Sequence, residues 1–227
     1  MTNPIIDNTG CSDDSGIGYS AASGGSLIID NNLLDNANYI NTGGTSTYAV
    51  QSLDAGSITI NGGGIFSLSG YGGIVFYSTG NGATITATNS TLTIAGDYAT
   101  GLQADSGGAI TGNNLTVNVS SSSPTDFAKG AYASGASSMI ELIGGSVQTN
   151  VQNTGYGLYA DSNATITTSN VAINVATATT SGNTLFGAYA DGATIHLMNG
   201  SVQANGGERS HGLDALSQGE ISANNRL

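Results

Sequence analysis

Three tyrosines at equivalent positions of a repeated sequence are the strongest candidates for binding chemistry in this chain. Tyr132, Tyr159 and Tyr189 each occupy the third place of a Gly-x-Tyr-Ala segment. If these segments are strands, alternation directs all three side chains outward at one position of three successive repeats. Such a ladder could stack on sugar rings or on a partner protein, since tyrosine joins an apolar face to a hydrogen-bonding tip. The simpler alternative is that the rings pack on one another or under neighbouring loops.

A second pattern imitates a catalytic motif. Residues 105–108 read Asp-Ser-Gly-Gly, as around the nucleophile of serine proteases, but both histidines, His196 and His211, follow this serine and contradict the chain order of that family. An aspartate stands at the same place of the repeat at Asp161 and Asp191. A repeated turn therefore explains the motif better than a catalytic triad.

Metal and cofactor sites are not expected either. Asp105, Asp161 and Asp191 share one turn slot and could stack around a cation, but solvated turns are the simpler explanation, and the nonapeptide Ca²⁺ repeat is absent. Neither His196 nor His211 has a second His or a Cys at ligand spacing. Cys11 is the single cysteine and is interpreted as a free thiol without function.

Glycan cleavage needs paired carboxylates at a suitable separation, or Ca²⁺ with a basic residue. Asp13-Asp14 is the one adjacent acidic pair, and it precedes the first repeat without partners. The three permanent cations, Lys129, Arg209 and Arg226, leave little with which to recognise an acidic polymer. We therefore expect a protein that is not an enzyme.

Composition narrows the partners further. Charged residues make up 8% of the 227 residues, and the formal net charge is −12. No basic face is available to neutralise phosphates, so nucleic acid is not an expected partner. No apolar run approaches the roughly 18 residues of a spanning helix, so we expect no direct membrane insertion.

These side chains must be positioned by a repeat. Eight isoleucines recur every 25 to 30 residues, each in a short strand-like segment: Ile28, Ile58, Ile85, Ile110, Ile140, Ile166, Ile195 and Ile221. A period of this length is typical of a solenoid. We expect an all-β parallel β-helix over residues 18–227, with about eight coils of three strands each, behind an N-terminal cap or extended segment at residues 1–17.

The walls, corners and loops of each coil follow from the same pattern. The isoleucines and the small or aliphatic residues of the preceding strand should face one axis. Asn and Gly return between the second and third strands, where positive φ and stacked Asn side chains are expected. The longest connections from third to first strand, residues 35–47, 118–129 and 176–186, should form one lateral ledge.

Residues 157–175 and 187–203, with their Gly-x-Tyr-Ala, Ala-Thr-Ile and Val-rich segments, resemble the passenger domains of type V bacterial autotransporters, which include pertactin-like and self-associating adhesins. The resemblance runs from about Gly18 to the end of the chain. It implies a right-handed β-helix that is exported and displayed at the bacterial cell surface through a C-terminal outer-membrane barrel. We expect the chain to be a passenger fragment without that barrel.

The resemblance implies adhesion, self-aggregation or biofilm formation, with a host or bacterial surface protein, a glycan or a second copy as partner. Two alternatives stay open: an inert stalk that displays a distal domain, and a β-helix that binds or cleaves polysaccharides. No site of the family transfers residue by residue. We expect binding through the outer face, where the tyrosine ladder is the candidate site, and through the lateral loops.

Overall fold

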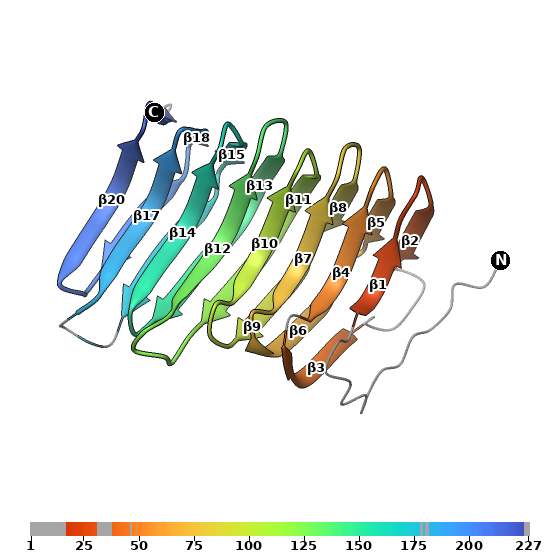
Figure 1. The fold of residues 1–227 in the computed structure, drawn as a ribbon, viewed down its shortest axis with the longest axis horizontal. Helices are drawn as coiled ribbons and strands as arrows, with labels where there is room; N and C mark the ends of the chain where they lie inside the picture. The colour runs from red at the N-terminus through yellow and green to blue at the C-terminus, as the bar shows by residue number, and fades with distance from the viewer. Residues whose placement is uncertain (1–16, 31–37, 46, 178, 180–181, 225–227) are drawn as a thin grey trace.

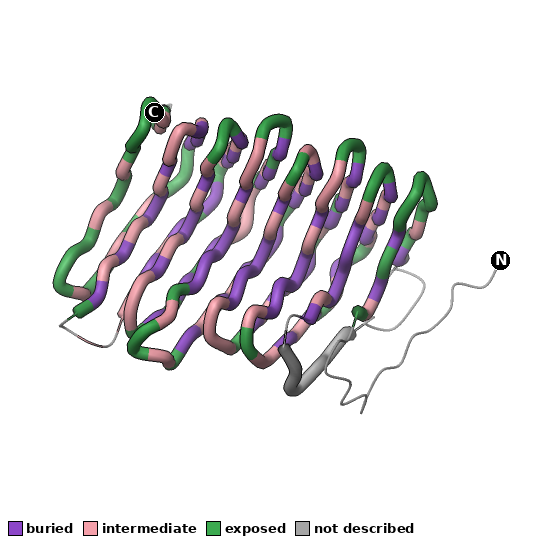
Figure 2. The backbone as a smooth tube through the Cα atoms, viewed as in Figure 1, coloured by how far each residue is buried: buried purple, intermediate pink, exposed green. Residues whose placement is uncertain are grey.

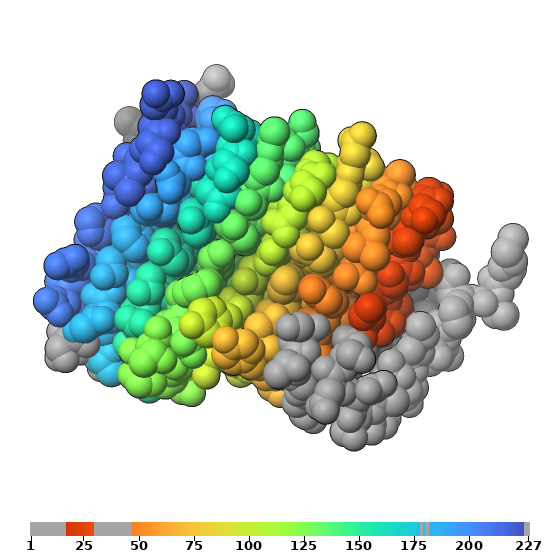
Figure 3. Space-filling view, viewed as in Figure 1, coloured from red at the N-terminus to blue at the C-terminus, as the bar shows by residue number. Residues whose placement is uncertain are grey.

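A computed structural model describes residues 17–30, 38–45, 47–177, 179 and 182–224. Within these residues every regular element is a strand, and no helix is long and apolar enough to cross a membrane. The strands wind into a parallel β-solenoid whose coils lie side by side in chain order along the long axis (Figures 1 and 3). The predicted cap, residues 1–17, lies outside the described residues except for Ile17, which begins β1.

The first wall is a sheet of eight parallel strands, one from each coil, in the order β1-β4-β7-β10-β12-β14-β17-β20. These eight strands agree with the expected number of coils, and about seven turns of the solenoid separate β1 from β20. The strands are β1 Ile17–Ala21, β4 Tyr48–Leu53, β7 Ile74–Thr79, β10 Thr100–Asp105, β12 Phe127–Ser134, β14 Thr154–Asp161, β17 Thr184–Asp191 and β20 Arg209–Leu216.

The other strands form a single 13-stranded sheet. Its main path is β2 Ser26–Asp30, β5 Ser57–Asn61, β8 Thr84–Thr88, β11 Ala109–Ser120, β13 Met139–Val151, β15 Thr165–Ser169, β18 Thr194–Met198 and β21 Glu220–Asn224. Beside it lie β3 Asn38–Thr45, β6 Gly64–Tyr71, β9 Ser90–Ala95, β16 Ala172–Thr177 and β19 Ser201–Asn205. The expected second and third strands run together as one strand in β11 and β13, so the coils differ in how many strands they contain.

The aliphatic ladder of this second sheet is confirmed from Ile58 to Ile221, each residue opposite the next in register. From Ile58 to Ile195 these side chains are almost completely buried. Figure 2 shows that buried positions recur along the strands of the middle coils. Ile28 is a correction: Leu27 lies opposite Ile58, and Ile28 is 54% exposed. Since side chains alternate along a strand, a shift of one residue turned the expected inward position outward.

The inward face of the eight-stranded sheet packs against the core. Its expected inward residues are buried from Val50 in β4 to Ala190 in β17, but Leu213 in β20 is 47% exposed. Strand β20 pairs only with β17 among the described strands, so no coil described here stacks on its other side. A Cβ on Gly157 would lie 2.5 Å from Ile173 Cγ2, and Gly101, Gly130 and Gly187 are equally tight against valine side chains. The repeated glycine thus lets the walls approach each other.

The Asn corners are confirmed. Asn89, Asn114, Asn170 and Asn199 all have φ between 52° and 57°, a region that Asn tolerates better than most residues. The Asn114 side-chain amide donates to Asn89 Oδ1 at 2.9 Å, which links adjacent coils along the axis as expected. The corner conformation therefore repeats from coil to coil.

The expected lateral ledge is shorter than predicted. Residues 35–47 contain strand β3, while β11 extends to Ser120 and β16 to Thr177. The connections that remain between strands are residues 121–126 and 178–183, and part of the second lies outside the described residues. Pairing with the neighbouring coils extended these strands into segments whose polar composition had suggested loops.

Candidate binding surface

The structure brings the three predicted tyrosines together on the outer face of the eight-stranded sheet. Tyr132 in β12 lies opposite Tyr159 in β14, which lies opposite Tyr189 in β17. The ring centroids are 5.0 Å apart for Tyr132 and Tyr159, and 5.1 Å for Tyr159 and Tyr189. All three side chains are partly buried rather than freely exposed, because each ring covers its neighbour.

A second column runs beside the first and was not predicted. Lys129, Tyr156, Phe186 and His211 lie opposite one another in consecutive strands, three residues before the first column. Tyr156 and Phe186 stack at 5.0 Å with an interplanar angle of 7°, and His211 stacks on Phe186 at 5.0 Å. Tyr156 also touches Tyr159 at 4.9 Å, so the two columns form one cluster.

The sequence does carry a signal for this second column. Each member directly precedes the glycine of the Gly-x-Tyr-Ala segment or its counterpart, as in Tyr156-Gly157 and Phe186-Gly187. Simple alternation fails here because Gly157 and Leu158 are both buried, so two consecutive residues face the interior. Tyr156 and Tyr159, although three residues apart, therefore lie on the same outer face of the sheet.

We call the aromatic strip the set of Tyr132, Tyr156, Tyr159, Phe186 and Tyr189. Lys129 is inserted at its edge, with Nζ 3.3 Å from the ring centroid of Tyr132 and 4.7 Å from that of Tyr159. Phe127 contributes a third ring at 5.2 Å. Only 9% of Lys129 is exposed, and burial lowers the pKa of its ammonium to about 8, although Asp161 and Asp105 favour the charged form.

Carboxylates line one side of the strip. Asp161 and Asp191 are neighbours in register, as expected, while Ser134 separates Asp161 from the position of Asp105. The Tyr132 hydroxyl donates a hydrogen bond to Asp161 Oδ2 at 3.0 Å, and Gln103 donates to Asp105 Oδ2 at 2.8 Å. The other carboxylate oxygen of Asp105 and of Asp161 is buried without a hydrogen-bond partner. Burial raises the pKa of Asp105 above its usual value.

The phenols of the strip remain protonated at neutral pH. Burial, with a contribution from the nearby Asp161 charge, raises the pKa of Tyr132 to about 12 and that of Tyr159 further. Burial also raises the pKa of Tyr156 and Tyr189. The strip therefore offers hydroxyl donors and acceptors rather than phenolate charge.

A smaller aromatic group lies near the corner that leads into the eight-stranded sheet. Tyr71 contacts Tyr98 at 5.0 Å, and Tyr98 contacts Phe127 edge-to-face at 4.7 Å. The hydrogen bond to the Asp126 carboxylate and its charge raise the pKa of Tyr98. Phe127 and Lys129 connect this group to the aromatic strip.

The other candidates form no site in the part of the chain that is described. Ser106 has a φ of 52° in a turn, like Ser162 in a later coil. His196 hydrogen-bonds Ser222 at 2.6 Å, and His211 lies 3.3 Å from Asp214. No group of three potential metal ligands occurs among the described residues. Cys11, Asp13 and Asp14 lie outside them.

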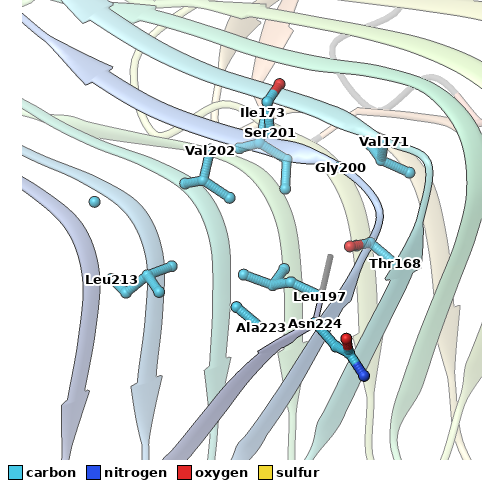
Figure 4. Close-up of a pocket in the computed structure, with 11 residues that line it drawn as sticks. Thr168, Val171, Ile173, Leu197, Gly200, Ser201, Val202, Leu213, Ala223 and Asn224 are labelled. Carbon is cyan, nitrogen blue, oxygen red and sulfur yellow. The ribbon is translucent and has the colours of Figure 1, made fainter. Parts of the chain in front are cut away.

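A cavity of about 330 Å³ opens at the C-terminal end of the solenoid. Figure 4 shows Leu197, Val202, Leu213 and Ala223 around it. These residues continue the columns that fill the core of earlier coils, and no residue among the lining is ionisable. The cavity therefore lies where the core ends in the last described coils.

The chain was compared with protein families, curated protein sequences and solved structures. No protein-family model, no curated protein sequence and no solved structure matches this chain.

Proposed function

We propose that this chain is a right-handed, three-faced β-helix from the passenger of a type V autotransporter, displayed at the bacterial cell surface. It acts in adhesion and has no enzymatic activity. The repeated Gly-x-Tyr-Ala and Ala-Thr-Ile segments support this assignment, together with the parallel solenoid fold in which they stack.

The aromatic strip is the observation that carries the adhesive role. Five aromatic rings from β12, β14 and β17 gather on the outer face of the sheet, each partly accessible. The interior of these coils is already filled by aliphatic side chains, so the rings are not needed to build the core. A gathered apolar patch with polar tips on a rigid surface is typical of a site of interaction.

The orientation of the rings favours a protein surface as partner. The faces of Tyr156 and Phe186 cover each other at 5.0 Å, and Tyr159 covers part of Tyr132. A sugar ring stacks on an open aromatic face, whereas a protein can pack against ring edges and hydrogen-bond the phenols and carboxylates. The net charge of −12 opposes association with a second copy.

The test compares two sets of substitutions in the chain displayed on cells. The triple variant Tyr132→Ser, Tyr159→Ser and Tyr189→Ser removes the first column of the strip. The control variant Tyr48→Ser and Tyr77→Ser removes another stacked pair of the same sheet, whose rings are 5.0 Å apart. We expect only the triple variant to lose attachment to an epithelial cell layer.

Treatment of the cell layer separates the partner classes. Protease treatment should abolish attachment, and periodate oxidation of glycans should leave it intact. Clumping of the displaying cells in the absence of the layer would instead indicate self-association. If the triple variant folds, as circular dichroism would show, and attaches as well as the parent chain, the strip is packing within an inert stalk and the proposal is wrong.

A further inference from the structure

Tyrosine rings pair along the described chain, in all but one case across two neighbouring coils. Among the side chains that the structure describes, eight tyrosines make contacts between two tyrosine rings, with centroids 4.9 to 5.6 Å apart. The pairs are Tyr48–Tyr77, Tyr71–Tyr98, Tyr132–Tyr159, Tyr156–Tyr159, Tyr156–Tyr189 and Tyr159–Tyr189. The chain contains no tryptophan, so tyrosines are its most easily oxidised rings.

Tyr159 is the centre of this arrangement. Its ring touches those of Tyr132, Tyr156 and Tyr189, at 5.0, 4.9 and 5.1 Å. An electron removed from any of the four rings leaves a radical beside another tyrosine. Tyr132 and Tyr159 also lie directly opposite each other in the parallel register of β12 and β14, which holds the pair in place.

Tyr132 has a built-in proton acceptor. Its hydroxyl donates to Asp161 Oδ2 at 3.0 Å, within the range that a base needs for proton transfer. The phenol does not ionise at neutral pH because its pKa is raised to about 12, so the proton must leave together with the electron. The resulting phenoxyl radical is neutral, because the phenol proton passes to Asp161.

We propose that the Tyr132–Tyr159 pair is a site of oxidative cross-linking, at which hydrogen peroxide and a peroxidase close a dityrosine bond between two adjacent coils. Each phenol gives one electron to the peroxidase and one proton to a base, which is Asp161 for Tyr132. The two radicals join through a carbon–carbon bond ortho to the oxygens, and the ring protons at those carbons move to the oxygens. One molecule of hydrogen peroxide is reduced to two of water.

The experiment treats the purified protein, at low concentration, with horseradish peroxidase and limiting hydrogen peroxide. Dityrosine fluorescence should appear in protein that still migrates as a monomer. Cleavage after Lys129 and Glu141 frees residues 130–141, which contain Tyr132 as their only tyrosine. Cleavage before Asp161 and after Glu141 frees residues 142–160, which carry Tyr156 and Tyr159. Mass spectrometry should detect these two peptides joined, with the bond at Tyr159.

Matched variants separate the proposed chemistry from accidental oxidation. Tyr132→Phe should remove the joined peptide, whereas Tyr48→Phe, from another stacked pair, should leave it unchanged. Asp161→Asn keeps a hydrogen-bond acceptor but loses the base, so it should lower the yield of this bond relative to the Tyr71–Tyr98 bond in the same sample. Cross-links that join only separate molecules, or an Asp161→Asn yield equal to that of the parent, would overturn the proposal.

Discussion

The ammonium of Lys129 lies 3.3 Å from the centre of the Tyr132 ring, and the lysine is almost fully buried on the outer side of a sheet. Burial of a charge without a close counter-ion destabilises a fold, and the contact with aromatic faces offsets only part of this cost. The pKa of Lys129 is lowered from 10.5 to about 8, so burial still disfavours the charged form after the favourable contacts are included. Lys129 therefore makes stability depend on pH.

Lys129→Met should stabilise the protein at pH 7. The lowered pKa corresponds to about 3 kcal/mol of unfavourable burial, at about 1.4 kcal/mol for each pKa unit. The variant also loses the contacts between the cation and the rings, which lowers its stability by about 1–2 kcal/mol. We expect the free energy of unfolding, measured with urea, to increase by about 1–2 kcal/mol, and Arg209→Met, at an exposed cation, to change it little.

The same pair of proteins should differ less at higher pH. Because the folded pKa of Lys129 lies below the unfolded value, the unfolded chain binds more protons between about pH 8 and pH 10.5. The stability of the parent protein should therefore rise relative to Lys129→Met across this window, while below pH 8 the difference stays constant. A parent that loses stability relative to the variant between pH 8 and pH 9.5 would contradict the assignment.

Ile140→Asp should unfold the middle coils. Ile140 has no exposed surface and lies between Ile110 and Ile166 in the ladder. An unpaired carboxylate there should cost about 4 kcal/mol or more. Ile143→Asp is the matched control, since Ile143 belongs to the same strand but is 41% exposed, and we expect a change of about 0.5 kcal/mol. Equal melting temperatures for the two variants would exclude the ladder.

Gly157→Ala tests the close approach of the walls. The added methyl would meet Ile173 Cγ2 at 2.5 Å and the Gly187 carbonyl oxygen at 2.5 Å, so about 1–3 kcal/mol of stability should be lost. Gly212 is the equivalent residue of β20, and its added Cβ would meet nothing within 4 Å. Gly212→Ala should stabilise by about 0.4–1 kcal/mol. Thermal unfolding should therefore show a lower melting temperature for Gly157→Ala and a higher one for Gly212→Ala than for the parent protein.

Asn114 at its corner combines a positive φ with an amide bond to Asn89. Asn114→Ala should cost about 1–2 kcal/mol, because alanine is strained in this conformation. Asn114→Gly relieves the strain but also loses the amide bond, so it should cost less. If the two substitutions destabilise equally in urea unfolding, the side-chain bond rather than the backbone conformation decides the effect.

The sequence predicted the repeat well because its strongest signals are local and periodic. Ile58 to Ile221, the Asn corners and the tyrosine column each follow from one residue type that returns once per coil. Ile28 was misplaced since two isoleucines and a leucine stand together there, and periodicity cannot choose among neighbours. The pairing of Leu27 with Ile58 decided the register.

Two of the five rings of the aromatic strip could not be found by alternation. Tyr156 and Phe186 share a face with Tyr159 and Tyr189 only because two consecutive residues, such as Gly157 and Leu158, both turn inward. The burial of Lys129 depends on rings from β12 and β14 together, so no local pattern reveals it. Contacts between coils, whose residues are distant in sequence, decide which side chains join the aromatic strip and how deeply Lys129 is buried. The sequence of a single strand does not show this.

The glycine column also bears on how a chain of this kind can change length. Removal of residues 130–156 would join Lys129 to Gly157 and give Lys-Gly-Leu-Tyr, the same pattern of side chains that Lys129-Gly130-Ala131-Tyr132 has now. Each coil contacts mainly the coil before and the coil after it, so the remaining neighbours would meet surfaces of the kind they already have. Duplication or loss of a whole coil is thus a small step for the gene, whereas insertion of a single residue shifts every position that follows within its coil.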